Sequence, residues 1–125
     1  MTLVLDSGAL IALERNERSM WVRLKAAERS GEIPLSHGGV LGQVWRGGPR
    51  QARVSVALQG IDVRSLDRSL ARAVGELLAR TSSSDVIDAA VVLLSVDGDQ
   101  IVTSDRDDFA GLVTAAGRHV ELIRP

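Results

Sequence analysis

The sequence predicts a single three-layer α/β domain, with a five-stranded, mostly parallel sheet flanked by helices. Short apolar segments alternate with amphipathic helical segments along the chain, which is the pattern of βα units. The first apolar segment, Leu3–Leu5, is continuous, as expected for a strand covered on both faces. The chain has 125 residues, the size of one domain, and shows no repeat or linker. We therefore treat residues 1–125 as one domain.

Five short segments are expected to form strands. In chain order they are Thr2–Leu5, Ile33–Ser36, Ile61–Arg64, Gln100–Thr103 and Val120–Ile123. Pro34 has no N–H group to donate, so the second strand is expected to be poorly paired or near an edge of the sheet.

Seven segments with helical spacing of apolar residues lie between these strands. In order they are Ala9–Glu14, Glu17–Arg29, Gly38–Arg46, Pro49–Gln59, Asp67–Arg80, Asp85–Val96 and Arg106–Ala115.

Residues with known preferences for helix ends support these boundaries. Ser7, Asp67 and Ser84 stand where N-caps are expected. Gly31 follows the second helix, as glycine often does after a helix end, and Pro49 suits a first helical turn. Trp45 is expected to be buried by its amphipathic helix.

Charge is unevenly distributed along the chain. The formal net charge is -1, but the segment from Asp85 to Asp108 holds seven acidic residues and only one basic residue, Arg106. The remainder has nine acidic and fourteen basic residues, and arginine supplies all basic residues except Lys25. An acidic site on a basic body suits a metal-dependent enzyme that acts on a polyanion. A GC-rich genome would also explain the arginine excess.

Several classes of protein are disfavoured by composition. The chain has no cysteine, which excludes disulfides and thiolate chemistry, and its two histidines cannot form a usual zinc site by themselves. No segment approaches the ~20 apolar residues of a membrane span, and the N-terminus lacks the pattern of a signal peptide. We expect a cytoplasmic protein with no membrane contact.

Aspartates stand at positions where α/β proteins bind ligands. Asp6 ends the first strand, Asp105 follows the fourth, and Asp88 lies in the first turns of a helix. The carboxyl ends of parallel strands share one rim, so these acids are expected to meet and to raise one another's pKa. Mg²⁺ or Mn²⁺ would relieve that repulsion and can generate a hydroxide that attacks a phosphodiester in line.

Each acid also has a structural interpretation. Asp6 and Asp105 stand where helix caps occur, and Asp85 lies where a helix dipole favours a carboxylate. Asp97-Gly98-Asp99 has the composition of a turn. Arg46, Arg50 and Arg53 follow a Gly-Gly turn and suit either an exposed helix face or contacts with RNA phosphates.

Three motifs in this order resemble the PIN domain and, more narrowly, VapC-type toxins of bacterial toxin–antitoxin pairs. They are Leu-Val-Leu-Asp-Ser ending at Ser7, Asp88-Ala89 in a helix of small apolar residues, and Ile-Val-Thr-Ser-Asp ending at Asp105. The resemblance covers nearly the whole chain. It implies a five-stranded parallel sheet, Mg²⁺- or Mn²⁺-dependent endoribonuclease activity and homodimerisation. It also implies inhibition by a cognate VapB-type antitoxin whose C-terminal segment enters the active-site groove.

The resemblance also implies roles for individual residues. The metal ligands would be Asp6, Asp88 and Asp105. The family usually has a fourth acid, a Glu in a helix of the form Glu-Val-Trp-Arg, and this chain has Gln43 there. An amide can hold a water but adds no charge, so either Asp85 or Gln43 completes the catalytic set, with Asp108 as a further candidate.

Three functions remain open from sequence. The first is a metal-dependent endoribonuclease toxin. The second is a catalytically weak or inactive PIN-like module that binds RNA or the antitoxin, because Gln43 replaces an acid. The third, a phosphate-accepting receiver-like domain, needs a lysine near its last strand, and Lys25 lies in an early helix.

Overall fold

A computed structural model describes all residues, 1–125, and contains one five-stranded sheet. The strands are β1 (Leu3–Leu5), β2 (Leu35–His37), β3 (Asp62–Arg64), β4 (Gln100–Val102) and β5 (Glu121–Ile123). Their order is β3-β2-β1-β4-β5, and every neighbouring pair is parallel. The predicted fold class and strand number are confirmed.

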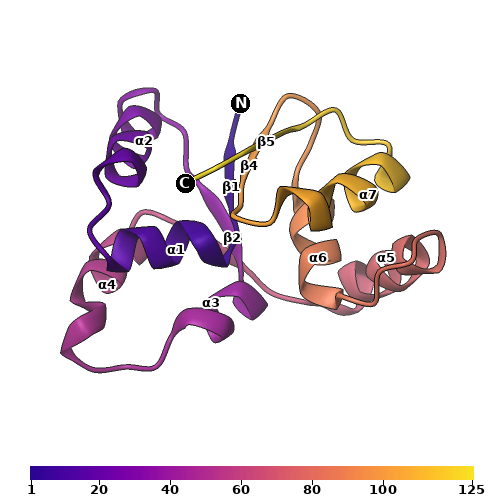
Figure 1. Cartoon of the computed structure of the whole chain (residues 1–125), viewed down its shortest axis with the longest axis horizontal. Helices are drawn as coiled ribbons and strands as arrows, with labels where there is room; N and C mark the ends of the chain where they lie inside the picture. The colour runs from indigo at the N-terminus through magenta and orange to yellow at the C-terminus, as the bar shows by residue number, and fades with distance from the viewer.

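Seven α-helices cover the two faces of the sheet. They are α1 (Ser7–Glu14), α2 (Arg18–Arg29), α3 (Gly38–Val44), α4 (Ala52–Leu58), α5 (Arg68–Ala79), α6 (Val86–Leu94) and α7 (Arg106–Ala116), and a 3-10 turn (Pro49–Gln51) precedes α4. Figure 1 shows α1 to α4 on one side of the sheet and α5 to α7 on the other. No helix has both the length and the apolar character needed to cross a membrane.

The core is centred on β1 and α6. All three residues of β1 are buried, and the four consecutive residues Ala89–Val92 of α6 are fully buried. Alanine at two of these positions lets the helix backbone approach β1 and β2, against which α6 packs. Complete burial of a side chain such as Leu5 stabilises the fold by about 1.5–3 kcal/mol. Two of the elements next to candidate acids, the strand before Asp6 and the helix that contains Asp88, are therefore deeply buried.

The second strand was expected to be poorly paired or near an edge, and β2 lies next to the edge strand β3 and shares only one residue pair, Leu35 with Val4, with β1. The strand begins at Leu35, after Pro34, so the missing N–H group falls outside the paired residues. The carbonyl of Pro34 still accepts a hydrogen bond from Asp62 N at 2.9 Å. A proline directly before a strand is compatible with an interior position.

Three local predictions need correction. Asp85, not Ser84, is the N-cap of α6, and Ser7 lies inside α1 instead of capping it. Trp45 is 41% exposed, whereas we expected it in the core. The helix α3 ends at Val44, so Trp45 has extended backbone geometry and leaves the helix face that packs inward.

Candidate metal centre

Asp6 and Asp105 reach the same rim because β1 and β4 are parallel neighbours. Leu5 is in register with Val102, and Asp6 N donates a hydrogen bond to Val102 O at 3.0 Å. Asp6 therefore follows β1 at the level where Thr103 follows β4, and Asp105 lies two residues further along. Sequence reasoning placed these two acids at one edge of the sheet, and the structure brings them together there.

Asp6 is buried, with 3% of its surface exposed, yet its side chain does not cap α1. The hydroxyl of Thr103 instead donates a hydrogen bond to Asp6 Oδ2 at 2.8 Å. Burial raises the pKa of Asp6 above its usual value, and the negative charges of Asp105 and Asp85 raise it further, whereas hydrogen bonds from Ser7 and Thr103 act in the opposite direction. A role limited to capping is thus excluded for this side chain.

Asp88 lies in the first turn of α6, and Asp85 fixes the start of that helix. Asp85 Oδ1 accepts a hydrogen bond from Asp88 N at 2.9 Å, which is the usual N-cap contact. Burial raises the pKa of the Asp88 carboxyl to about 7, and the charges of Asp85, Asp6, Asp108 and Asp105 contribute to the rise. Asp88 is therefore the acid whose pKa is raised by the charges of all four of these aspartates.

Asp105 stands at the N-cap position of α7, but its side chain makes no capping hydrogen bond. Its backbone N–H donates to Thr103 Oγ1 at 3.0 Å. Thr103 thus connects two candidate acids, since its hydroxyl donates to Asp6 and accepts from the backbone of Asp105. Our sequence reasoning missed Thr103, although its place between an apolar strand and Asp105 was a usable signal.

Two glycines allow the backbone around the acids to come close. A Cβ atom at Gly8, in the first turn of α1, would clash with Ser104 Oγ, so glycine lets α1 approach the loop that carries Asp105. A Cβ atom at Gly39 would lie 2.8 Å from the side chain of Ile87, the residue before Asp88. Substitution at either glycine would push apart the segments that carry the site.

Gln43 is less closely connected to the acids than the other candidates. It lies on the exposed side of α3, and its side chain makes no hydrogen bond. Gln43 is four residues after Gly39 and thus on the same face of the helix, the face that touches Ile87. The structure places Gln43 in the same region as α6 but shows no contact between its amide and an aspartate.

His37 shares this rim and has a role that sequence reasoning did not assign. It is the last residue of β2, and its Nδ1 accepts a hydrogen bond from Gly39 N at 3.0 Å, which caps α3. Only 3% of His37 is exposed, Nε2 has no partner, and burial lowers the pKa of the imidazole. The side chain is thus a helix cap, and its burial favours the uncharged imidazole.

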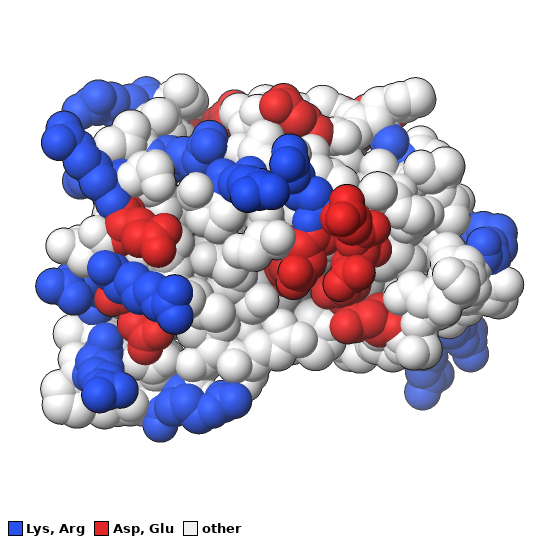
Figure 2. Space-filling view, viewed as in Figure 1, with Lys and Arg blue, Asp and Glu red and all other residues white.

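Two polar hollows open around the acids. One, of about 460 Å³, is lined by Asp85, Asp88, Asp107 and Asp108 together with the hydroxyl-rich segment 81–84. The other, of about 240 Å³, is lined by Asp105, Asp107, Asp108, Ser104, Arg106 and Arg124. Figure 2 shows a compact patch of acidic side chains near the middle of this face of the molecule, with basic side chains directly beside it.

The donor chemistry suits a hard divalent cation, although the side chains do not already form a coordination sphere. No group of three or more His, Asp or Glu side chains is arranged closely enough to hold a metal ion. All the candidate donors are carboxylate oxygens, which Mg²⁺ and Mn²⁺ prefer. Burial, and after it the charges of neighbouring carboxylates, raises the pKa values of Asp6 and Asp88, and a bound cation would lower both.

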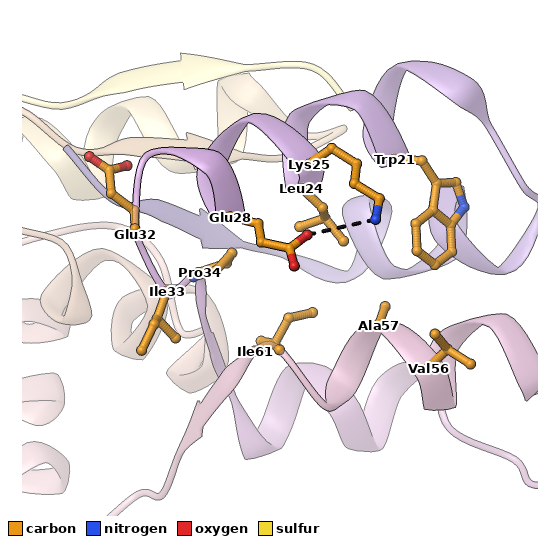
Figure 3. A pocket seen from close by; sticks show the side chains of 12 residues that line it. Trp21, Leu24, Lys25, Glu28, Glu32, Ile33, Pro34, Val56, Ala57 and Ile61 are labelled. Carbon is orange, nitrogen blue, oxygen red and sulfur yellow. Dashed lines mark ion pairs between the residues drawn. The ribbon is translucent and has the colours of Figure 1, made fainter.

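A third hollow has a different character. Its volume is about 470 Å³, and it lies between α2 and α4. Figure 3 shows Trp21 and Leu24 from α2 facing Val56 and Ala57 from α4, while Lys25 and Glu28 form an ion pair of 3.7 Å along its border. Trp21 Nε1 is buried without a hydrogen-bond partner. We call this hollow the apolar groove.

Fold and site together define an α/β protein with an acidic cluster at the carboxyl edge of a parallel sheet. Among known proteins, no family model matches the chain and no curated protein shows significant similarity to it. Functional conclusions therefore rest on the residues themselves.

Proposed function

We propose that the chain is a metal-dependent endoribonuclease of the PIN-domain type, acting as the VapC-like toxin of a toxin–antitoxin pair. The observation that carries the proposal is the mutual effect of acids that are far apart in sequence. Asp6 and Asp105 follow β1 and β4, and Asp88 lies in α6; burial is the main cause that raises the pKa of Asp88 to about 7, and the charges of Asp6 and Asp105 add to the rise. Carboxylates that lie close together without a cation repel one another, so selection for stability alone would not favour such a cluster.

Asp6, Asp88 and Asp105 are the residues that would hold Mg²⁺ or Mn²⁺. When bound, such an ion supplies Lewis-acid activation of water and neutralises charge on a phosphate. The chain itself positions the acids. The Thr103 hydroxyl orients Asp6 through its hydrogen bond, and Asp85 fixes the first turn of α6 and with it Asp88.

Asp85 and Gln43 complete the proposed catalytic set in different ways. Asp85 uses Oδ1 for its helix cap, and its charge contributes to the raised pKa values of both Asp6 and Asp88. It therefore supplies negative charge that the Gln43 amide cannot. Gln43, with an amide free of hydrogen bonds, is available to orient a water or a substrate group on the α3 side.

The proposed partners are RNA, a VapB-type antitoxin and a second copy of the chain, in the cytoplasm. The apolar groove supports the existence of a protein partner, because exposed apolar surface bordered by charged residues is typical of interaction sites. Light scattering on the purified chain, alone and with a VapB-type antitoxin, would test dimer and complex formation.

Cleavage of RNA by purified variants tests the nuclease proposal. We expect the parent chain to cleave single-stranded RNA with Mg²⁺ or Mn²⁺ but not with EDTA, and Asp6→Asn to be inactive while its circular dichroism is unchanged. Asp107→Asn is the matched control, because Asp107 is exposed and does not contribute to the raised pKa of Asp6 or Asp88. Equal cleavage by the parent and Asp6→Asn would refute the proposal.

The second candidate is a PIN-like binding module with little or no activity. It is favoured by Gln43 in place of an acid and by the lack of three acids already arranged around one point. The variant Gln43→Glu separates the two candidates. A large gain in cleavage would indicate an impaired site, whereas an active parent that gains little would favour the first proposal.

A further inference from the structure

Two arginines flank the acidic cluster on the β5 side. Arg124 directly follows β5, and because Val102 is in register with Ile123, it stands beside Thr103 at the carboxyl rim. Arg106 is the first residue of α7, next to Asp105. Both arginines are exposed, and both line the hollow of about 240 Å³ that also contains Asp105 and Asp108.

A third arginine reaches this point from the opposite face of the sheet. Arg23 belongs to α2, and its Nη2 donates a hydrogen bond to the carbonyl of Arg124 at 3.3 Å. Its Nε is buried and has no hydrogen-bond partner. The guanidinium is therefore held at the end of β5 by its own chain, and Nη1, which is not buried, makes no hydrogen bond within the chain.

None of these three arginines is neutralised by a carboxylate. The ion pairs of the structure are Met1–Glu32, Lys25–Glu28 and Arg64–Asp62. Figure 2 shows basic side chains gathered against the edge of the acidic patch. Arg106 and Arg124 share a hollow with Asp105, Asp107 and Asp108 but form no ion pair with them, so their guanidinium groups remain available to an anion such as a phosphate.

We propose that Arg23, Arg106 and Arg124, here called the arginine triplet, bind consecutive phosphates of a single-stranded RNA on the β5 side of the cleavage site. The inference rests on the proposed function, and it adds the direction in which the strand leaves the acidic cluster. Guanidinium groups bind phosphate through paired N–H donors, and each contact releases counterions from the RNA.

The arginines after the Gly-Gly turn are a weaker choice for this role. Arg46 already donates from Nη1 to the carbonyls of Gly42 and Trp45. Arg50 and Arg53 are exposed, but neither lines a hollow that contains a candidate acid. The triplet is distinguished by its position on the rim that carries Asp105.

Salt-dependent RNA binding tests the triplet without requiring cleavage. The probe is a fluorescein-labelled single-stranded RNA, titrated with protein in EDTA, and binding is followed by fluorescence anisotropy at several salt concentrations. We expect each of Arg23→Ala, Arg106→Ala and Arg124→Ala to weaken binding several-fold. Each should also reduce the slope of log K against log salt by about 0.7, the value for one phosphate contact with a single strand.

Arg29→Ala is the matched control, since it removes the same charge from the same helix as Arg23. Arg29 lies near the end of α2, and Glu32 just beyond it pairs with the N-terminal amine at 3.3 Å, which places this end at the opposite rim of the sheet. The slope of log K against log salt for Arg29→Ala should equal that of the parent chain. Arg23→Lys, which keeps the charge, guards against misfolding of Arg23→Ala and should retain most of the slope.

The outcome separates this inference from the nuclease proposal. Metal-dependent cleavage with unchanged KM and salt slope in the triplet variants would overturn the triplet and leave the nuclease intact. Reduced slopes in a chain that never cleaves RNA would support the triplet and contradict the nuclease. A parent chain that does not bind RNA, or an Arg29→Ala loss equal to that of the triplet variants, would overturn the triplet.

Discussion

The two ends of α6 use aspartate in opposite ways. After the helix, Asp99 is 4% exposed and accepts hydrogen bonds from the backbone N–H groups of Thr2 and Val96, both at 2.9 Å. Before the helix, Asp88 is partly buried, and burial together with neighbouring carboxylates raises its pKa to about 7. One buried acid is supplied with donors by the fold, and the other is surrounded by like charges.

The difference teaches that burial of an acid does not by itself mark a functional site. Asp97 resembles Asp99, since it accepts a hydrogen bond from His119 N at 2.9 Å and fixes the turn. These two acids account for part of the negative charge between Asp85 and Asp108 and have structural roles. Asp6 and Asp88, whose pKa values are raised by burial and then by neighbouring carboxylates, are the acids that an external cation would stabilise.

The largest expected effect concerns RNA cleavage. Asp88→Asn should reduce metal-dependent cleavage by about 100-fold or more, since loss even of a residue that only supports a metal ligand costs 10–100-fold. Asp97→Asn should cleave RNA at nearly the rate of the parent chain, because its amide oxygen can still accept from His119 N. Single-turnover assays on both variants measure the difference. Similar rates for the two variants would remove the distinction between the two groups of acids.

For the free energy of unfolding, we expect the largest effect at Asp99, an acid with a structural role outside the site. Asp99→Ala leaves two backbone N–H groups without acceptors and should lower the free energy of unfolding by about 2–4 kcal/mol. The exposed Asp107 makes no side-chain hydrogen bond, so Asp107→Ala should change that free energy by less than about 0.5 kcal/mol. Urea denaturation followed by circular dichroism gives both values. A loss below about 1 kcal/mol for Asp99→Ala would show that the turn does not depend on it.

The pH dependence of the free energy of unfolding should reveal the raised pKa of Asp88. Its pKa is higher in the folded chain than the ordinary value of 3.8, so its stabilising contribution is complete below about pH 4 and is lost as pH rises through about 7. In metal-free protein, we therefore expect the free energy of unfolding to fall from pH 4 to pH 7, and Asp88→Asn to flatten that fall. An identical pH profile in the variant would show that Asp88 titrates normally.

The smallest expected effect concerns Thr103, which connects the acids. Thr103→Val removes the hydrogen bond to Asp6 and the acceptor for Asp105 N, with little change in side-chain volume. We expect a loss of about 1–2 kcal/mol in unfolding free energy at pH 8. The pKa of Asp6, followed by NMR of its carboxyl carbon, should rise further because one of the hydrogen bonds that lowers it is gone. A lower pKa in the variant would contradict this assignment.

Periodicity predicted the fold well, because alternating apolar strands and amphipathic helices leave few arrangements other than a parallel sheet with helices on both faces. The same reasoning brought Asp6 and Asp105 to one rim. It failed where a role depends on a distant partner. The hydrogen bond from Thr2 N to Asp99 joins residues 97 positions apart, and no local sequence pattern predicts it.

The error at Trp45 has a local cause: the side chain is exposed because α3 ends at Val44, two residues before the predicted end at Arg46. The contact between Arg23 and the end of β5 spans 101 positions, so the arginine triplet was not visible in the sequence. Sequence indicates which residues reach the rim, whereas the structure shows which of them are already satisfied by backbone donors.

Calorimetric titration of Mn²⁺ into metal-free parent chain and Asp6→Asn tests the central claim most directly, because it requires no knowledge of the RNA substrate. We predict saturable binding to the parent chain, with protons released to the buffer as Asp88 ionises, and binding at least tenfold weaker in Asp6→Asn. Equal Mn²⁺ affinity in the two proteins, or no binding to the parent chain, would contradict the account.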